Sequence, residues 1–133
     1  LYLLRNLSRG EVIGFFEASN FYPDFILWIV NGNKQSITFI DPKGLAMLRP
    51  NDFSNPKIQL YHTLQTSIAP RLGNPNITLD SYIISTESHS ETVKYFGDPN
   101  NPYPPDEFRA HHVLFPGLTA GQLLDALLVT PEE

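Results

Sequence analysis

The sequence PDFILWIV at residues 23–30, the turn NGN at residues 31–33 and the sequence QSITFID at residues 35–41 set the architecture that we expect for this chain. Apolar side chains occupy both alternating faces of the first segment, which predicts a central strand covered on both sides. The turn has the residues of a tight hairpin. The two flanking segments are therefore predicted to pair as antiparallel strands.

This hairpin brings together two acidic residues that are far apart in the sequence. If residues 32–33 form the loop, Asp24 lies directly opposite Asp41, and opposed residues share a face with Cβ atoms roughly 5 Å apart. Lys43 points to the same side if the strand geometry continues past Asp41. If the loop begins one residue earlier, Asp41 falls opposite Tyr22 and the two aspartates are diagonal neighbours instead.

Two carboxylates placed in this way repel each other, so a folded protein needs a compensating charge beside them. Mg²⁺ takes one or two carboxylates and completes its coordination with water and phosphate oxygens. A nearby ammonium group can orient the attacking water and stabilise charge developing on phosphorus. Asp24, Asp41 and Lys43 are therefore candidate catalytic residues for phosphodiester hydrolysis, with the two acids as ligands of Mg²⁺ or Mn²⁺.

Pro23-Asp24, the hairpin and then Asp41-Pro42-Lys43 resemble the PD-(D/E)xK nuclease superfamily, which has the restriction-endonuclease-like fold. In that family the first acid opens one strand and the acid-x-Lys triplet ends the next. Both acids bind Mg²⁺, and the lysine assists the attacking water. The resemblance implies an α/β fold with a central mixed sheet flanked by helices, and DNA as the substrate.

The wider stretch from FYPDFILWIV (residues 21–30) to FIDPKGL (residues 39–45) is similar to the nuclease domain near the C-terminus of type III restriction subunits and related DEAD/DEAH-box helicase-like proteins. This similarity implies a cytoplasmic restriction or DNA-processing protein whose helicase or motor portion lies elsewhere in the parent chain. The sequence begins at Leu1 inside an apolar pattern, which agrees with one nuclease-like domain over residues 1–133 cut from a longer protein.

The family usually carries a further metal-proximal Glu on a helix before the first strand, and this sequence has no clear counterpart. Glu11 and Glu17 are the available acids, and Glu17 is the closer to the predicted site, so it is a candidate metal ligand. If that helix lies upstream of Leu1, the alternative is a catalytically silent domain that keeps the fold. Such a domain would position DNA or contact another protein.

Composition limits the remaining classes of function. A chain of 133 residues suits one domain, and the absence of Cys excludes disulfides and a thiolate zinc site. The longest apolar run, residues 25–30, is far too short to span a membrane. The net charge of −5 is opposite to what phosphate binding requires, so bound cations or the parent protein must supply positive charge if the domain binds DNA.

Asp80, Ser85 and His89 have the residue types of a hydrolase triad, but no nucleophile elbow accompanies them.

The rest of the sequence predicts further strands at residues 1–5, 12–17, 77–86 and 112–115, helices at residues 56–69, 91–96 and 120–129, and a loop at residues 98–106, which are rich in Pro and Asn. One helical turn is the alternative for residues 12–17. In the family, a helix such as that at residues 56–69 can offer a polar residue to the site, which makes Lys57 and Gln59 secondary candidates. The alternative is that both residues belong to the solvent-exposed face of the helix.

Overall fold

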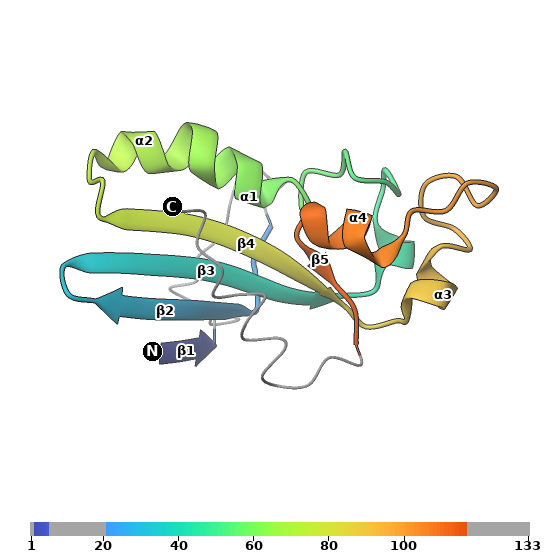
Figure 1. Ribbon diagram of the computed structural model, residues 1–133, viewed down its shortest axis with the longest axis horizontal. Coiled ribbons are helices and arrows are strands. Elements are labelled where there is room, and N and C mark those ends of the chain that lie inside the picture. The colour runs from blue at the N-terminus through green and yellow to red at the C-terminus, as the bar shows by residue number, and fades with distance from the viewer. Residues whose placement is uncertain (1, 6–20, 117–133) are drawn as a thin grey trace.

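The computed structural model describes residues 2–5 and 21–116, and these residues form a mixed α/β structure (Figure 1). One five-stranded sheet has the order β1-β2-β3-β4-β5. The first three strands pair antiparallel, whereas β4 runs parallel to β3 and β5 runs parallel to β4. The strands are β1 (Tyr2–Arg5), β2 (Phe25–Asn31), β3 (Lys34–Lys43), β4 (Ile77–Ser85) and β5 (Val113–Leu114). The strand and helix predicted at residues 12–17 and 120–129 lie outside the described residues.

The hairpin between β2 and β3 has the register that a two-residue loop imposes. Asn31 pairs with Lys34, which leaves two residues in the loop. The first of them, Gly32, has φ 64, in the left-handed region that glycine adopts without steric cost. The alternative loop, one residue earlier, is therefore wrong. In this register, Asp24 before β2 and Asp41 near the end of β3 reach the same end of the sheet.

The middle strand of the sheet is β3, so the prediction that residues 23–30 form the central strand was wrong in position. β2 lies next to β1, and all four residues of β1 are exposed. The first half of β2 is nevertheless buried on both faces, because Ile26 is 7% exposed and Leu27, on the opposite face, is 3% exposed. The apolar residues in the first half of β2 are thus buried on both faces of the sheet, as their pattern predicts.

A helical segment covers one face of the sheet and lies along β4 (Figure 1). After β3 the chain forms the 3-10 turn η2 (Leu45–Met47), and then three consecutive helical pieces before it enters β4. These pieces are α1 (Leu60–Thr63), the π-helical turn η3 (Leu64–Ile68) and α2 (Ala69–Leu72). The main hydrophobic core lies between this segment and the sheet, and its members include Ile26, Phe39, Leu60, Leu64 and Ile83.

The helix predicted at residues 56–69 is displaced toward the C-terminus. The residues after Asn55 form turns, and the helix begins only at Leu60. Pro70 does not end it. We attribute this to the π-helical turn before Pro70, whose wider hydrogen-bond spacing accommodates a residue without an N–H group. The helix ends instead at Gly73, which has φ 63.

Two short helices connect β4 to β5. α3 (His89–Thr92) begins earlier than the helix predicted at residues 91–96, because the Ser88 side chain accepts a hydrogen bond from the first turn and caps it. α4 (Pro105–Ala110) overlaps the loop predicted at residues 98–106. None of the helices within the described ranges is long and apolar enough to cross a membrane.

Candidate functional site

Asp24 and Asp41 meet at the end of the sheet where β2 begins and β3 ends. Phe25, the first residue of β2, pairs with Ile40, so the same register continued by one residue sets Asp24 against Asp41. The backbone N–H of Asp24 donates a hydrogen bond of 2.9 Å to Oδ1 of Asp41. The structure therefore brings the two predicted acids together, and the main chain of one orients the side chain of the other.

Lys43 completes this cluster from the last position of β3. Its Nζ lies 3.2 Å from Oδ2 of Asp41. The strand continues through Pro42, so Asp41 and Lys43 share a face of the sheet, as the sequence predicts. The side chain of Asp41 is 4% exposed and that of Lys43 is 25% exposed. A buried carboxylate and a solvent-accessible ammonium group thus form an ion pair at the site.

Burial raises the pKa of Asp41 above its ordinary value of 3.8, and the charge of Asp24 acts in the same direction. The ammonium group of Lys43 and the backbone N–H of Asp24 oppose this effect without cancelling it. The negative charge of Asp41 is therefore costly in the folded protein even beside Lys43. A further cation at the acidic pair would lower that cost.

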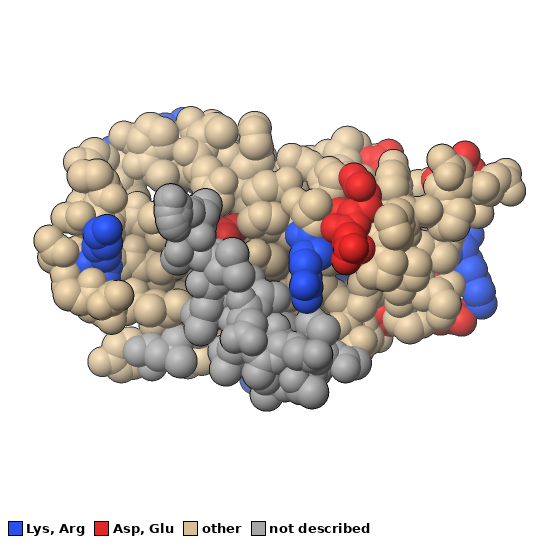
Figure 2. Space-filling view, in the orientation of Figure 1, with Lys and Arg blue, Asp and Glu red and all other residues tan. Residues whose placement is uncertain are grey.

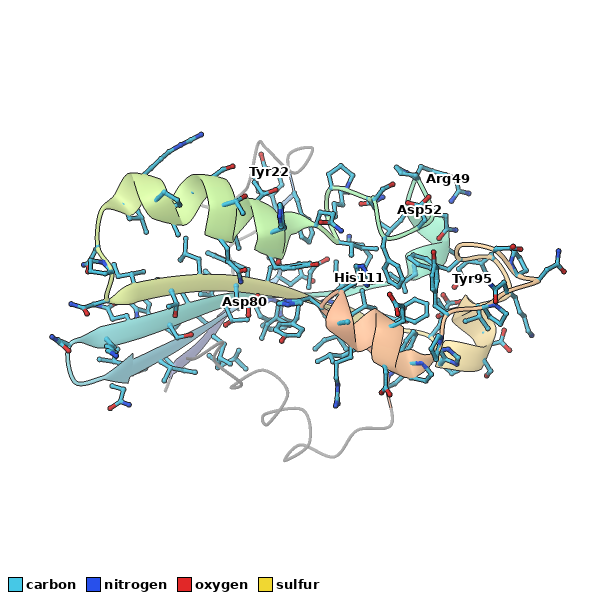
Figure 3. All side chains as sticks on the ribbon, turned by 45° about the horizontal axis from the view of Figure 1, so that its top comes forward. Tyr22, Arg49, Asp52, Asp80, Tyr95 and His111 are labelled. Carbon is cyan, nitrogen blue, oxygen red and sulfur yellow. The ribbon has the colours of Figure 1, made fainter. Side chains whose placement is uncertain are left out.

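The segment that leads into β2 alternates between buried and exposed residues. Phe21 and Pro23 are buried, whereas Tyr22 and Asp24 are exposed. Figure 3 places Tyr22 beside the start of α1. The buried ring of Phe21 packs in the main core and so anchors the segment that carries Asp24.

Two ammonium groups lie close to the ring of Phe21. Nζ of Lys43 is 5.4 Å from the ring centroid, and Nζ of Lys57 is 5.9 Å from the same point. Both distances are within the range of a cation–π contact. Lys57 comes from the turns before α1, so the helical layer adds a second positive charge close to Lys43. Gln59, the other secondary candidate, donates instead to the backbone carbonyl of Phe53.

The donor set at this end of the sheet suits a hard divalent cation. Mg²⁺ and Mn²⁺ favour carboxylate oxygens, and Mg²⁺ needs only one or two of them because water and phosphate supply the rest. Within residues 2–5 and 21–116, no third His, Asp or Glu joins Asp24 and Asp41 in one group. Glu17, the predicted third ligand, lies outside these residues. The described part of the site is thus a two-carboxylate arrangement.

The residues of the rejected hydrolase triad are not assembled. Ser85 donates to a nearby backbone carbonyl, and Nε2 of His89 lies 2.7 Å from the carbonyl oxygen of Tyr103. Asp80 instead contacts Nδ1 of His112 at 2.9 Å. Each residue has a separate structural partner, so no serine nucleophile is activated among them.

Sequence reasoning did not identify Phe21 or Tyr22 as parts of the site. The available signal was the pair of adjacent aromatic residues directly before Pro23-Asp24, of which Phe21 is buried and Tyr22 is exposed. On the face drawn in Figure 2, the positively charged side chains of the described residues stand at separate places and form no continuous basic stripe. The electrostatic character of the site therefore rests on the local cluster of acids and lysines.

A search of protein-family models, of curated proteins and of solved structures finds nothing that matches this chain.

Proposed function

We propose that this chain is a metal-dependent nuclease domain of the PD-(D/E)xK superfamily, with a restriction-endonuclease-like fold, that hydrolyses phosphodiester bonds of DNA. The observation that carries the proposal is the cluster of Asp24, Asp41 and Lys43. Asp41 accepts the backbone N–H of Asp24 at 2.9 Å and contacts Nζ of Lys43 at 3.2 Å. One acid directly before β2 and an acid and a lysine at the end of β3 thus converge at one end of the sheet.

The positions of these residues on the strands also support the proposal. Asp24 stands directly before β2, and Asp41-Pro42-Lys43 are the last three residues of β3. This is the arrangement in the superfamily, where one acid opens a strand and the acid-x-Lys triplet ends the next. The surrounding mixed sheet with a helical layer on one face agrees with the same architecture.

Each residue of the cluster has a distinct role in this mechanism. Asp24 and Asp41 would hold Mg²⁺ or Mn²⁺, which supplies charge stabilisation at phosphorus and eases the ionisation of water. The backbone of Asp24 keeps the carboxylate of Asp41 in one orientation. The partly exposed ammonium group of Lys43 donates hydrogen bonds to the attacking water and to a phosphate oxygen, so it stabilises charge as the new bond forms.

The proposed context is a cytoplasmic restriction or DNA-processing protein with a helicase portion elsewhere in the parent chain. The net charge of −5 is consistent with a domain that obtains part of its affinity for DNA from bound cations and from that portion.

A calorimetric titration with Mn²⁺ tests the proposal without knowledge of the DNA sequence. The protein should bind Mn²⁺ saturably, and Asp41→Ala should abolish this binding. Asp106→Asn, which removes an exposed acid from α4, is the matched control and should bind as the parent does. Cleavage of plasmid DNA in Mg²⁺ should follow the same pattern.

One observation favours the catalytically silent alternative, because both oxygens of Asp41 already have donors within the protein. That alternative predicts that the folded protein binds no Mn²⁺ and cuts no DNA, and that Lys43→Ala changes neither property. Saturable Mn²⁺ binding that depends on Asp41 would exclude it.

A further inference from the structure

Tyr22 is an exposed aromatic side chain on a firmly anchored piece of backbone. It is 54% exposed, whereas its neighbours Phe21 and Pro23 are both buried. No ring contact within the described residues involves Tyr22. The phenol ring is thus presented to solvent by residues that are themselves held in the core, and this lowers the entropy lost when a ligand orders it.

The place of this ring in the fold is informative. Tyr22 and Asp24 are the two exposed residues of the alternating segment that leads into β2. In Figure 3 the labelled Tyr22 lies beside the start of α1, the region from which Lys57 also comes. An exposed aromatic ring therefore stands two residues before Asp24 and directly after Phe21, whose ring contacts Lys57.

Lys57 supplies the complementary charge. Its side chain is half-buried, and Nζ lies 5.9 Å from the centroid of the Phe21 ring. Across the part of the chain that the structure describes, no carboxylate lies within ion-pair distance of Lys57. A partly desolvated cation without a carboxylate partner favours an anionic ligand. A ligand that offers both a flat ring and a negative charge is a nucleotide unit of a nucleic acid.

We propose that Tyr22 is a stacking platform for an unpaired base of DNA, and that Lys57 contacts the phosphate of the same strand. The inference rests on the proposed nuclease function and narrows it to DNA with a single-stranded segment beside the bond that is cut. In a duplex the faces of each base are covered by neighbouring base pairs, whereas a single strand leaves them free for an aromatic side chain.

The test is fluorescence anisotropy with a labelled oligothymidine, in Ca²⁺ so that cleavage is suppressed. Tyr22→Ala should weaken binding about tenfold, within the range for loss of one base–aromatic stack, and Tyr22→Phe should retain it. Tyr2→Ala is the matched control, because Tyr2 is 61% exposed on β1, away from the site; its affinity should equal that of the parent protein. Lys57→Ala should weaken binding and make it less dependent on salt.

A duplex of the same length should compete poorly with the oligothymidine. Equal affinity of Tyr22→Ala and the parent protein, no measurable binding of the oligothymidine by the parent protein, or tighter binding of the duplex would each overturn the inference. Failure of the nuclease proposal would give a different result. The parent protein would then neither bind Mn²⁺ nor cut DNA, whether or not it binds the oligothymidine through Tyr22.

Discussion

The backbone N–H of Asp24 donates a 2.9 Å hydrogen bond to Oδ1 of Asp41, so the orientation of the second acid depends on the main chain of the first and not on its side chain. Substitutions of the two acids should therefore have different effects. A change to the side chain of Asp24 removes a charge and leaves the orienting hydrogen bond in place. A change to the side chain of Asp41 removes both a buried charge and the acceptor of that bond.

Asp24→Ala should therefore fold normally and bind metal weakly. Asp24 is exposed, so we expect the free energy of unfolding to change by less than about 0.5 kcal/mol. Loss of one of two carboxylate ligands should weaken Mn²⁺ binding by at least about tenfold, a difference of about 1.4 kcal/mol. Calorimetry and urea denaturation of the same preparation measure the two quantities. Unchanged Mn²⁺ affinity would remove Asp24 from the metal site.

The pH dependence of stability reports on the buried charge of Asp41. Burial raises the pKa of this carboxyl above 3.8, so the folded state holds its proton more tightly than the unfolded state does. The contribution of Asp41 to stability is therefore largest below pH 3.8, and it falls as pH rises through the raised pKa. Asp41→Asn does not titrate, so relative to this variant the parent protein should lose stability as the pH rises from 3.8 through the raised pKa of Asp41.

Mn²⁺ should reverse this difference at neutral pH. An ion that binds only the folded parent protein stabilises it by about 2.7 kcal/mol at a hundred times its Kd, and it leaves Asp41→Asn unaffected. Thermal denaturation of both proteins, with and without Mn²⁺, measures the effect. Equal stabilisation of the two proteins would mean that the metal binds elsewhere.

The sequence predicts the hairpin and the meeting of the acids because both depend on local information. A two-residue loop fixes the register, and the register determines that Asp24 and Asp41 share one end of the sheet. The same reasoning fails where long-range packing decides. The apolar pattern of residues 23–30 indicates burial on two faces, but the place of β3 in the middle of the sheet depends on β4 joining from outside the hairpin.

One other difference, α4, has a local signal that the sequence analysis did not use. Pro104 and Pro105 come before two acidic residues, which is typical of the first turn of a helix and marks α4. The continuation of the helix through Pro70 requires the π-helical turn before it, which no pattern of apolar residues predicts. The half-buried position of Lys57 near the Phe21 ring likewise depends on how the helical layer packs on the segment before β2.

Lys43 is predicted to matter for cleavage far more than for folding. Its side chain is partly exposed, so Lys43→Ala should remain folded, while loss of its ammonium group should lower the rate of DNA cleavage by about 10²–10³-fold. Lys94→Ala is the control, because Lys94 forms an exposed ion pair with Glu91 on α3 and lies outside the site. Single-turnover cleavage in Mg²⁺ measures the rates. Equal rates for the two variants would contradict the role proposed for Lys43.

His112 follows α4 in the chain, and its side chain contacts β4 through Nδ1. Its Nδ1 lies 2.9 Å from Oδ1 of Asp80 and 3.0 Å from the carbonyl oxygen of Ser81. The carbonyl oxygen of Ser81 can only accept a hydrogen bond, so Nδ1 carries the hydrogen. The imidazole is stacked between the rings of Tyr61 and Tyr82, with centroids 3.8 and 4.5 Å away. These contacts hold the residue at φ 64, a conformation that side chains other than glycine adopt with a steric cost.

His112→Ala should therefore lower the free energy of unfolding by about 2 kcal/mol, because it removes the stack and one of the two groups that contact Oδ1 of Asp80, the other being the backbone N–H of Ser81. His112→Asn tolerates the left-handed backbone and keeps a donor without the aromatic ring, so its loss should be smaller. His62→Ala, at an exposed position of α1, is the control and should change stability by less than about 0.5 kcal/mol. Urea denaturation at neutral pH ranks the three variants. If His112→Ala were no more destabilising than His62→Ala, the stack and the bond to Asp80 would contribute nothing to the attachment of α4.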